Sequence, residues 1–197
     1  MLKLIDPVRF TAEEQDYIES ALKPLGGKGW YDIHKTTVNI KHHISEHTII
    51  AQGARCAYCE EVLSKGSLAI EHIANKGDYP EFSFEPFNLV TSCTSCNSPV
   101  NKGQNDTIAK PVDRTDYSNN RFVIVHPYFD NPDEHLKYVD KDKTILDWSN
   151  CSLKGKKTIE MFHWNEYWAF LKRLSIAQIR HYPTPVLKIA AEIASYK

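Results

Sequence analysis

Two pairs of cysteines have the spacing that binds metal ions in many proteins. Cys56 and Cys59 form one Cys-x-x-Cys pair, and Cys93 and Cys96 form another. Each pair places two sulfurs on one side of a tight turn, so two pairs supply the four ligands of a tetrahedral ion. The spacing therefore predicts a closed, structural Zn²⁺ site. Four buried free thiols or a redox pair are the alternatives, although no thioredoxin-like sequence surrounds either pair.

The segment between the pairs carries side chains suited to hydrolysis. Glu71 and His72 are adjacent, Asn88 follows a polar loop, and Asn97 comes directly after the second cysteine pair. A neutral imidazole can take a proton from water near pH 7, so His72 is a candidate general base. Glu71 and Asn97 offer the oxygens that a hard cation such as Mg²⁺ or Mn²⁺ prefers. Asn88 is a candidate for orienting His72, and Lys102 for contacting a phosphate.

Each of these residues also has an ordinary explanation when taken alone. A Glu-His pair is common on surfaces, Asn88 suits a turn, Asn97 suits a helix cap, and Lys102 suits a solvated surface. Neighbouring residues of a strand point to opposite faces, so Glu71 and His72 converge only if their strand bends or ends there. The catalytic interpretation therefore depends on the joint pattern.

The order of these residues over 54–105 resembles the HNH nuclease family, which has the ββα-metal fold. In that family an acidic residue and a histidine end one strand, an asparagine opens the next, and a histidine or asparagine begins the helix. The corresponding residues here are Glu71, His72, Asn88 and Asn97. The resemblance implies that the site hydrolyses phosphodiester bonds. Many relatives have a proline shortly after the histidine, where this chain has Ala74, Asn75 and Lys76, but none of the expected ligands is missing.

Longer stretches resemble one kind of HNH protein. The segments 56–60 (CAYCE), 126–136 (HPYFDNPDEHL) and 158–173 are similar to the HNH subunit of Septu-type antiphage systems, whose relatives also accompany some retrons. This resemblance implies an ABC-type ATPase as a partner.

Local patterns predict the elements that position these residues. Thr11 and Glu14 form a capping box that begins a helix ending near Pro24, and a glycine-rich turn follows it. A second helix is expected at 36–52. Strands are expected at 67–73, 88–90 and 121–125, with a helix between Cys93 and Gly103. Asn131 should cap a helix, and the last forty residues should form two more, the final one ending near Ser195.

These expectations define an α+β fold. A small ββα-metal core stapled by zinc, residues 54–110, is flanked by an N-terminal helical segment, 1–53, and a mixed, mainly helical region, 111–197.

Composition limits the classes of function. The chain has 197 residues, 42% of them hydrophobic and 25% charged, with a formal net charge of −1. A near-neutral protein does not coat nucleic acid by bulk charge, so any contact with nucleic acid must be local or shared with a partner. No apolar run approaches the roughly 20 residues of a membrane span, and a cytoplasmic location without membrane contact is expected.

The sequence therefore predicts a metal-dependent HNH endonuclease that cuts DNA, with RNA as an open alternative, within an ATPase-containing defence complex. A non-catalytic zinc-stabilised binding module is one competing hypothesis. A restriction or toxin nuclease that acts alone is the other.

Overall fold

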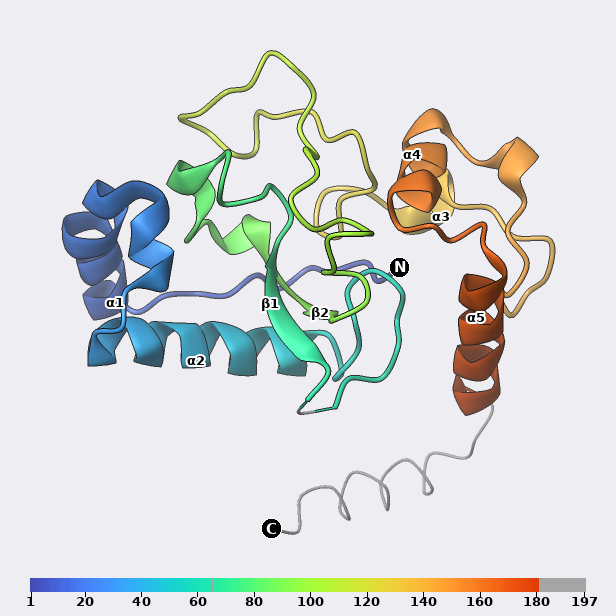
Figure 1. Ribbon diagram of the computed structural model, residues 1–197, viewed down its shortest axis with the longest axis horizontal. Helices are drawn as coiled ribbons and strands as arrows, with labels where there is room; N and C mark the ends of the chain where they lie inside the picture. The colour runs from blue at the N-terminus through green and yellow to red at the C-terminus, as the bar shows by residue number, and fades with distance from the viewer. Residues whose placement is uncertain (65, 181–197) are drawn as a thin grey trace, which may run out of the picture.

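The computed structural model describes residues 1–64 and 66–180, in which short helices surround one small sheet (Figure 1). In chain order the elements are α1 (Ala12–Tyr17), a π-helical turn (Ile18–Leu22), a 3-10 segment (Lys23–Tyr31), α2 (Lys35–Ala51), β1 (Leu68–His72), 3-10 turns at Pro80–Phe82 and Pro86–Asn88, β2 (Leu89–Cys93), α3 (Pro132–His135), a 3-10 turn (Trp148–Asn150), α4 (Leu153–Met161) and α5 (Tyr167–Arg180). None of the helices described is both long and apolar enough to cross a membrane.

The sheet is an antiparallel hairpin of β1 and β2. Leu68 pairs with Cys93 at one end and His72 pairs with Leu89 at the other. The two ends are about 14 Å apart, because each residue of a strand adds about 3.4 Å. The hairpin thus fixes the second cysteine pair at one end and Glu71 with His72 near the other.

The N-terminal helices pack beside this hairpin on an apolar cluster that also includes Phe84 and Leu89. The predicted capping box is present, with Thr11 and Glu14 bonded to each other's backbone amides. The predicted helix of about twelve residues is wrong in detail, since regular α1 ends at Tyr17 and continues as π and 3-10 turns. The glycine-rich stretch belongs to the 3-10 segment. Gly29 is needed there, because a Cβ at this position would lie 2.4 Å from the carbonyl oxygen of Leu22.

Helix α2 forms close to its predicted bounds and covers β2. Its buried residues Ile40 and Ile44 share a cluster with Leu89. The side chain of Gln52, just past the helix, accepts from the backbone N–H of Thr91 at 2.8 Å and donates to its carbonyl oxygen at 2.7 Å. Gln52 thus pairs the outward N–H of this residue of β2, and it shares the outward carbonyl oxygen with the backbone N–H of Ala57, which donates to it at 3.1 Å.

The helix predicted between Cys93 and Gly103 is wrong. Residues 94–104 form successive turns, so two strands of the expected ββα unit are present without its helix. Pro99 has no backbone N–H and disrupts a helix at its centre. The side-chain amide of Asn101 donates to the carbonyl oxygen of Ser95 at 2.7 Å, which stabilises the turn conformation in place of a helical hydrogen bond.

The strand predicted at 121–125 is also wrong. Only a single bridge joins Phe122 to Ile108. The backbone N–H of Val125 donates to Thr158 Oγ1 on α4 at 2.8 Å, so it is not available for pairing with a strand. An apolar, β-branched run is buried here as irregular chain against a helix.

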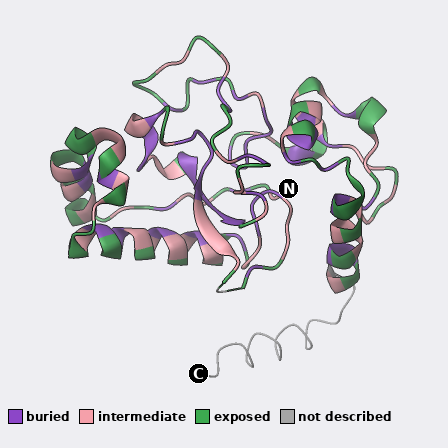
Figure 2. Ribbon diagram, viewed as in Figure 1, coloured by how far each residue is buried: buried purple, intermediate pink, exposed green. Residues whose placement is uncertain are grey.

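The C-terminal region packs on a larger cluster that includes the cysteines. Figure 2 shows buried residues following the hairpin and the chain around it. The predicted cap of α3 by Asn131 is confirmed. A single predicted helix over 159–174 is instead divided into α4 and α5 at His163, whose φ of 51° is left-handed. The final predicted helix, ending near Ser195, lies outside the described residues.

We predict that Gln52→Leu destabilises the protein by about 1–3 kcal/mol, because it leaves the backbone N–H of Thr91 unpaired, while the Thr91 carbonyl oxygen keeps its bond from Ala57. Urea unfolding would measure the loss. Gln15→Leu is the matched control, because Gln15 is exposed on α1. Equal stability of the two variants would contradict the assignment of α2 as the cover of β2.

Candidate functional site

The four cysteines of the two Cys-x-x-Cys pairs meet in space. Their sulfurs all lie within 4.8 Å of one another, and the sulfurs of Cys59 and Cys93 are 3.7 Å apart. Tetrahedral zinc with bonds of about 2.3 Å requires sulfur–sulfur distances of about 3.8 Å. The backbone N–H of Cys96 points at the Cys93 sulfur from 3.4 Å. The cluster could therefore hold a metal ion such as zinc.

Helix α5 contributes a cation to this cluster. Lys172 Nζ lies 3.6 Å from the Cys93 sulfur and 2.6 Å from Glu61 Oε2. Hydrogen bonds from the thiols of Cys56 and Cys59 lower the pKa of the Cys93 thiol. Burial disfavours the charge of Lys172, but the neighbouring cysteine sulfurs and the hydrogen bond to Glu61 outweigh it and raise the pKa of its ammonium. A deprotonated sulfur beside a charged lysine is the state in which thiols bind metals.

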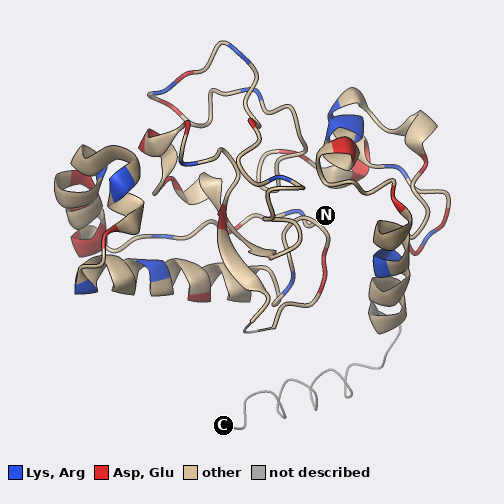
Figure 3. Ribbon diagram, in the orientation of Figure 1, with Lys and Arg blue, Asp and Glu red and all other residues tan. Residues whose placement is uncertain are grey.

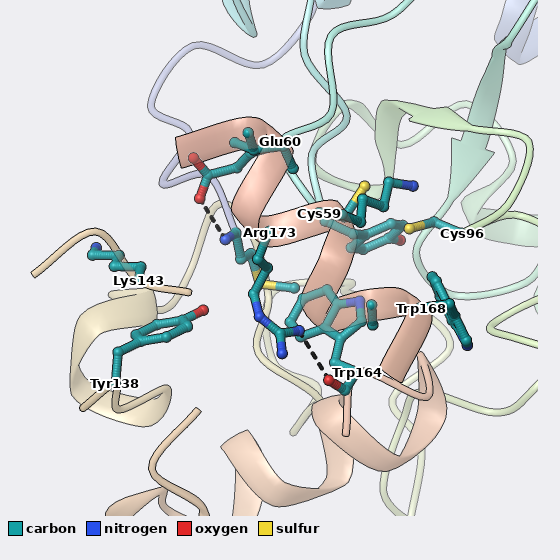
Figure 4. Close-up of a pocket in the computed structure, with 13 residues that line it drawn as sticks. Cys59, Glu60, Cys96, Tyr138, Lys143, Trp164, Trp168 and Arg173 are labelled. Atoms are coloured by element: carbon teal, nitrogen blue, oxygen red, sulfur yellow. Dashed lines mark hydrogen bonds and ion pairs between the residues drawn. The ribbon is translucent and has the colours of Figure 1, made fainter. Parts of the chain in front are cut away.

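A small pocket lies beside the cysteine cluster, where Cys59 and Cys96 face Trp164 and Trp168 (Figure 4). The guanidinium of Arg173 donates to the carbonyl oxygen of Trp164 at 2.9 Å across this pocket. Its cavity of about 30 Å³ has room for about one water molecule. It is therefore a packing gap between α5 and the cluster, too small to hold a substrate.

The predicted catalytic residues line another, larger pocket. Its volume is about 630 Å³, enough for a nucleotide-sized group. Glu71, His72, Asn97 and Lys102 all line it, so the structure brings four of the five candidate residues together. Asn88 does not line the pocket. The rest of the wall comes from Tyr31, Ile70, Asn75, Lys76, Gly77, Pro99, Gly103, Gln104 and Asn105.

His72 is held in one orientation by its surroundings. Its Nε2 lies 3.1 Å from the carbonyl oxygen of Ser83, which can only accept, so Nε2 carries the proton and Nδ1 the lone pair. The ring meets the indole of Trp30 edge-on, with centroids 4.3 Å apart. Burial, followed by the nearby charge of Lys76, lowers the pKa of His72 to about 3. The imidazole is thus neutral at pH 7.

Glu71 and Lys102 form a buried ion pair. Lys102 Nζ is 2.5 Å from Glu71 Oε1 and 2.6 Å from the carbonyl oxygen of His72. Lys102 is only 1% exposed, so the solvated lysine considered from sequence is wrong. Burial raises the pKa of Glu71, and the charge of Lys102 opposes that rise. A phosphate contact by Lys102 stays a prediction.

The donor groups fit a hydrated divalent cation. Glu71 offers a carboxylate and Asn97 an amide oxygen on an open pocket, and Mg²⁺ in proteins commonly takes one or two protein oxygens and keeps several waters. A cation there would share Glu71 with Lys102. The backbone N–H of Asn97 donates to the Cys93 carbonyl oxygen at 3.1 Å, so the cysteine turn also sets the position of Asn97.

Asn88 joins the two ends of the loop that follows β1. Its side-chain oxygen accepts from the N–H of Ala74 at 2.6 Å, and its amide donates to the carbonyl oxygens of Ala74 at 3.1 Å and Phe82 at 2.8 Å. Phe82 directly precedes Ser83, whose carbonyl holds the ring of His72. Asn88 is therefore placed to orient His72 through the loop.

Three residues around this pocket were not predicted from the sequence. Trp30 packs on His72, and Lys76 lies over the ring of Tyr31, 5.3 Å from its centroid. Tyr31 and Lys76 both line the pocket. No local pattern marks these contacts, because Trp30 and Tyr31 come from the N-terminal region and reach the site only through the fold.

Charged residues are distributed without an extended basic segment. Figure 3 shows Lys and Arg interspersed with Asp and Glu along the described elements. This distribution agrees with the net charge of −1. Strong binding to a long stretch of nucleic acid by charge alone is therefore not expected of this chain.

Comparison with known proteins gives partial matches. No protein-family model matches the chain. This chain is similar to Septu protein PtuB of Bacillus thuringiensis. The two are 32% identical over 117 residues, which make up 57% of this chain and 37% of PtuB. Protein ea31 of Escherichia phage lambda is 33% identical over 82 residues, 42% of this chain and 23% of that protein. The matched part thus spans well under half the length of either relative.

We predict that Cys59→Ser lowers the zinc content of the purified protein, which elemental analysis would measure. Chelation of the metal should speed hydrogen exchange first in residues 54–105, because metal-binding energy is also local folding energy. Cys151→Ser is the control, since Cys151 is a buried thiol outside the cluster. Unchanged exchange in 54–105 after chelation would contradict a structural metal.

We predict that Lys102→Met destabilises the protein by about 3–5 kcal/mol, because it leaves the Glu71 carboxylate buried without its partner. The double variant Glu71→Gln/Lys102→Met should recover most of this loss. Chemical denaturation of the single and double variants measures the coupling between the two residues. Additive losses would show that the two side chains do not depend on each other.

Proposed function

We propose that this chain is a metal-dependent HNH endonuclease that hydrolyses phosphodiester bonds in DNA. The observation that carries the proposal is the single pocket lined by His72, Glu71, Asn97 and Lys102. A base, an acidic ligand and a buried cation in one accessible cavity match the needs of phosphodiester hydrolysis. These needs are an activated water, neutralisation of charge at the phosphate, and help for the leaving oxygen.

His72 is the proposed general base. Its Nε2–H is engaged by Ser83, so Nδ1 is the nitrogen that would accept a proton from water. Burial keeps the ring neutral, which is the form that can act. A pKa near 3 makes it a weak base, so the attacking water must itself be acidified.

Glu71 and Asn97 are the proposed ligands of a catalytic Mg²⁺ or Mn²⁺. Such a cation would supply both the acidification of a nearby water and the neutralisation of phosphate charge. Lys102 favours the ionised form of Glu71, which is the form that binds cations, against the effect of burial, and Asn88 holds the loop that orients His72. Lys102 is also close enough to the pocket for its charge to act on a bound phosphate.

The proposed structural ion is Zn²⁺ in the cluster of four cysteines. Its place in the mechanism is to fix the turn that begins at Cys93. Because the N–H of Asn97 is bonded to the carbonyl oxygen of Cys93, the cluster and the pocket share this turn. Loss of the structural ion should therefore disturb Asn97 as well as the cysteines.

The biological setting that we propose is antiphage defence. The similarity to Septu protein PtuB over 57% of the chain supports it. The resemblance to Septu-type subunits also implies an ABC-type ATPase that senses infection and directs the nuclease. A net charge of −1 is compatible with an enzyme whose contact with DNA is completed by a partner.

We predict that His72→Ala lowers cleavage of plasmid DNA in Mg²⁺ or Mn²⁺ by about 10²–10⁴-fold, because it removes the general base. The assay is run with the chain alone and with any ABC-type ATPase that is encoded beside it. His42→Ala is the matched control, since His42 is an exposed histidine on α2.

The outcomes separate the competing functions. Cleavage by wild type and His42→Ala but not by His72→Ala supports the proposed enzyme. Equal cleavage by all three proteins indicates a contaminant or another site. Cleavage without the ATPase favours a nuclease that acts alone, and silence under every condition favours a non-catalytic binding module.

A further inference from the structure

A chain of buried hydrogen bonds extends from Asn88 into the region after residue 110. Tyr117 Oη lies 3.0 Å from Asn88 Oδ1 and 3.0 Å from His126 Nε2. All three side chains are buried: Asn88 and His126 are 0% exposed and Tyr117 is 3% exposed. Tyr117, which lies outside the segment 54–105, is thus bonded directly to the asparagine that closes the loop after β1, and His126 is connected to that asparagine through Tyr117.

The direction of each hydrogen bond in this chain is determined. His126 Nδ1 accepts from the backbone N–H groups of Tyr128 at 3.2 Å and Phe129 at 3.3 Å, so the proton of the neutral ring is on Nε2. Nε2 therefore donates to the Tyr117 oxygen. The Tyr117 hydroxyl therefore donates its proton to Asn88 Oδ1. Each polar atom of these three side chains then has a hydrogen-bond partner.

Packing holds the chain in this arrangement. The ring of His126 stacks on Phe129 with centroids 4.2 Å apart and an angle of 11° between the planes. The ring of Tyr117 meets Phe82 edge-on at 5.1 Å. Phe82 is also the residue whose carbonyl oxygen accepts from Asn88. Tyr117 therefore constrains the loop both through Asn88 and by direct contact.

We propose that Tyr117 and His126 are positioning residues for His72, acting through Asn88 and the Phe82–Ser83 peptide. This inference rests on the role proposed above for His72. Asn88 Oδ1 accepts hydrogen bonds from the Ala74 N–H and the Tyr117 hydroxyl, which fixes the amide so that its Nδ2 faces Phe82. The next carbonyl, that of Ser83, sets the direction of the His72 ring and so determines where Nδ1 points.

The test compares two buried tyrosines. Tyr117→Phe keeps the ring but removes the hydroxyl of the chain. Tyr128→Phe is the control, because Tyr128 is also buried and its hydroxyl donates to the carbonyl oxygen of Leu89 at 3.1 Å, without touching Asn88. We expect Tyr117→Phe to lower kcat about tenfold, at the lower end of the loss caused by removing a group that orients another, with KM unchanged. Tyr128→Phe should leave kcat unchanged at a similar loss of stability.

A second pair of variants tests His126. His126→Gln can still donate an N–H to Tyr117, whereas His126→Leu cannot. We expect the glutamine variant to retain most of the kcat that the leucine variant loses. An equal loss of kcat in the glutamine and leucine variants would show that His126 acts by packing alone, and it would overturn the positioning role.

The nitrogen resonances of His72, observed by NMR in the full chain, provide a readout independent of cleavage. Tyr117→Phe should shift the His72 ring signals and the Ala74 amide, and Tyr128→Phe should not. If the wild-type protein does not cleave DNA, the proposed nuclease function is wrong. The NMR shifts would still show whether Tyr117 positions the His72 ring. Unchanged His72 signals in Tyr117→Phe would overturn that positioning role.

Discussion

The register of the β1–β2 hairpin determines the rest of the site. Pairing of His72 with Leu89 places the loop after β1 directly beside Asn88, which can then bond to both of its ends. The same register pairs Leu68 with Cys93, so the second cysteine pair follows at the opposite end. A slip of one residue would turn Glu71 and His72 to the wrong faces and separate Asn88 from Ala74. A sheet of two strands is marginal in water, so this register needs support from outside the hairpin.

That support comes from both sides. On the N-terminal side, Gln52 satisfies the outward groups of Thr91 and Trp30 packs on His72. On the C-terminal side, Tyr117 bonds to Asn88 and Lys172 reaches the sulfur of Cys93. The segments around the hairpin thus supply walls and hydrogen-bond partners of the site itself. The motif residues alone would be exposed to water and free to reorient.

The parts of this arrangement that sequence could predict are those fixed by short-range chemistry. The Cys-x-x-Cys spacing, the cap at Thr11 and the apolar strand ending at His72 are each set by neighbours along the chain. Local patterns also predict a helix between Cys93 and Gly103, but Pro99 and short polar side chains favour turns there. The contacts of Trp30 and Tyr117 could not be predicted, because each joins residues far apart in sequence.

Burial sets a conflict that Lys102 resolves. The proposed hydrolysis would need a neutral His72 and an ionised Glu71, but burial favours the neutral form of both. Burial therefore favours the required neutral form of His72 but disfavours the required ionised form of Glu71. The ammonium of Lys102 lowers the pKa of Glu71 against burial, and it further lowers that of His72. One buried cation thus drives both groups toward the protonation states that the proposed chemistry requires. A neutral residue at 102 would leave burial unopposed by this charge at Glu71, and it would remove one of the charges that lower the pKa of His72.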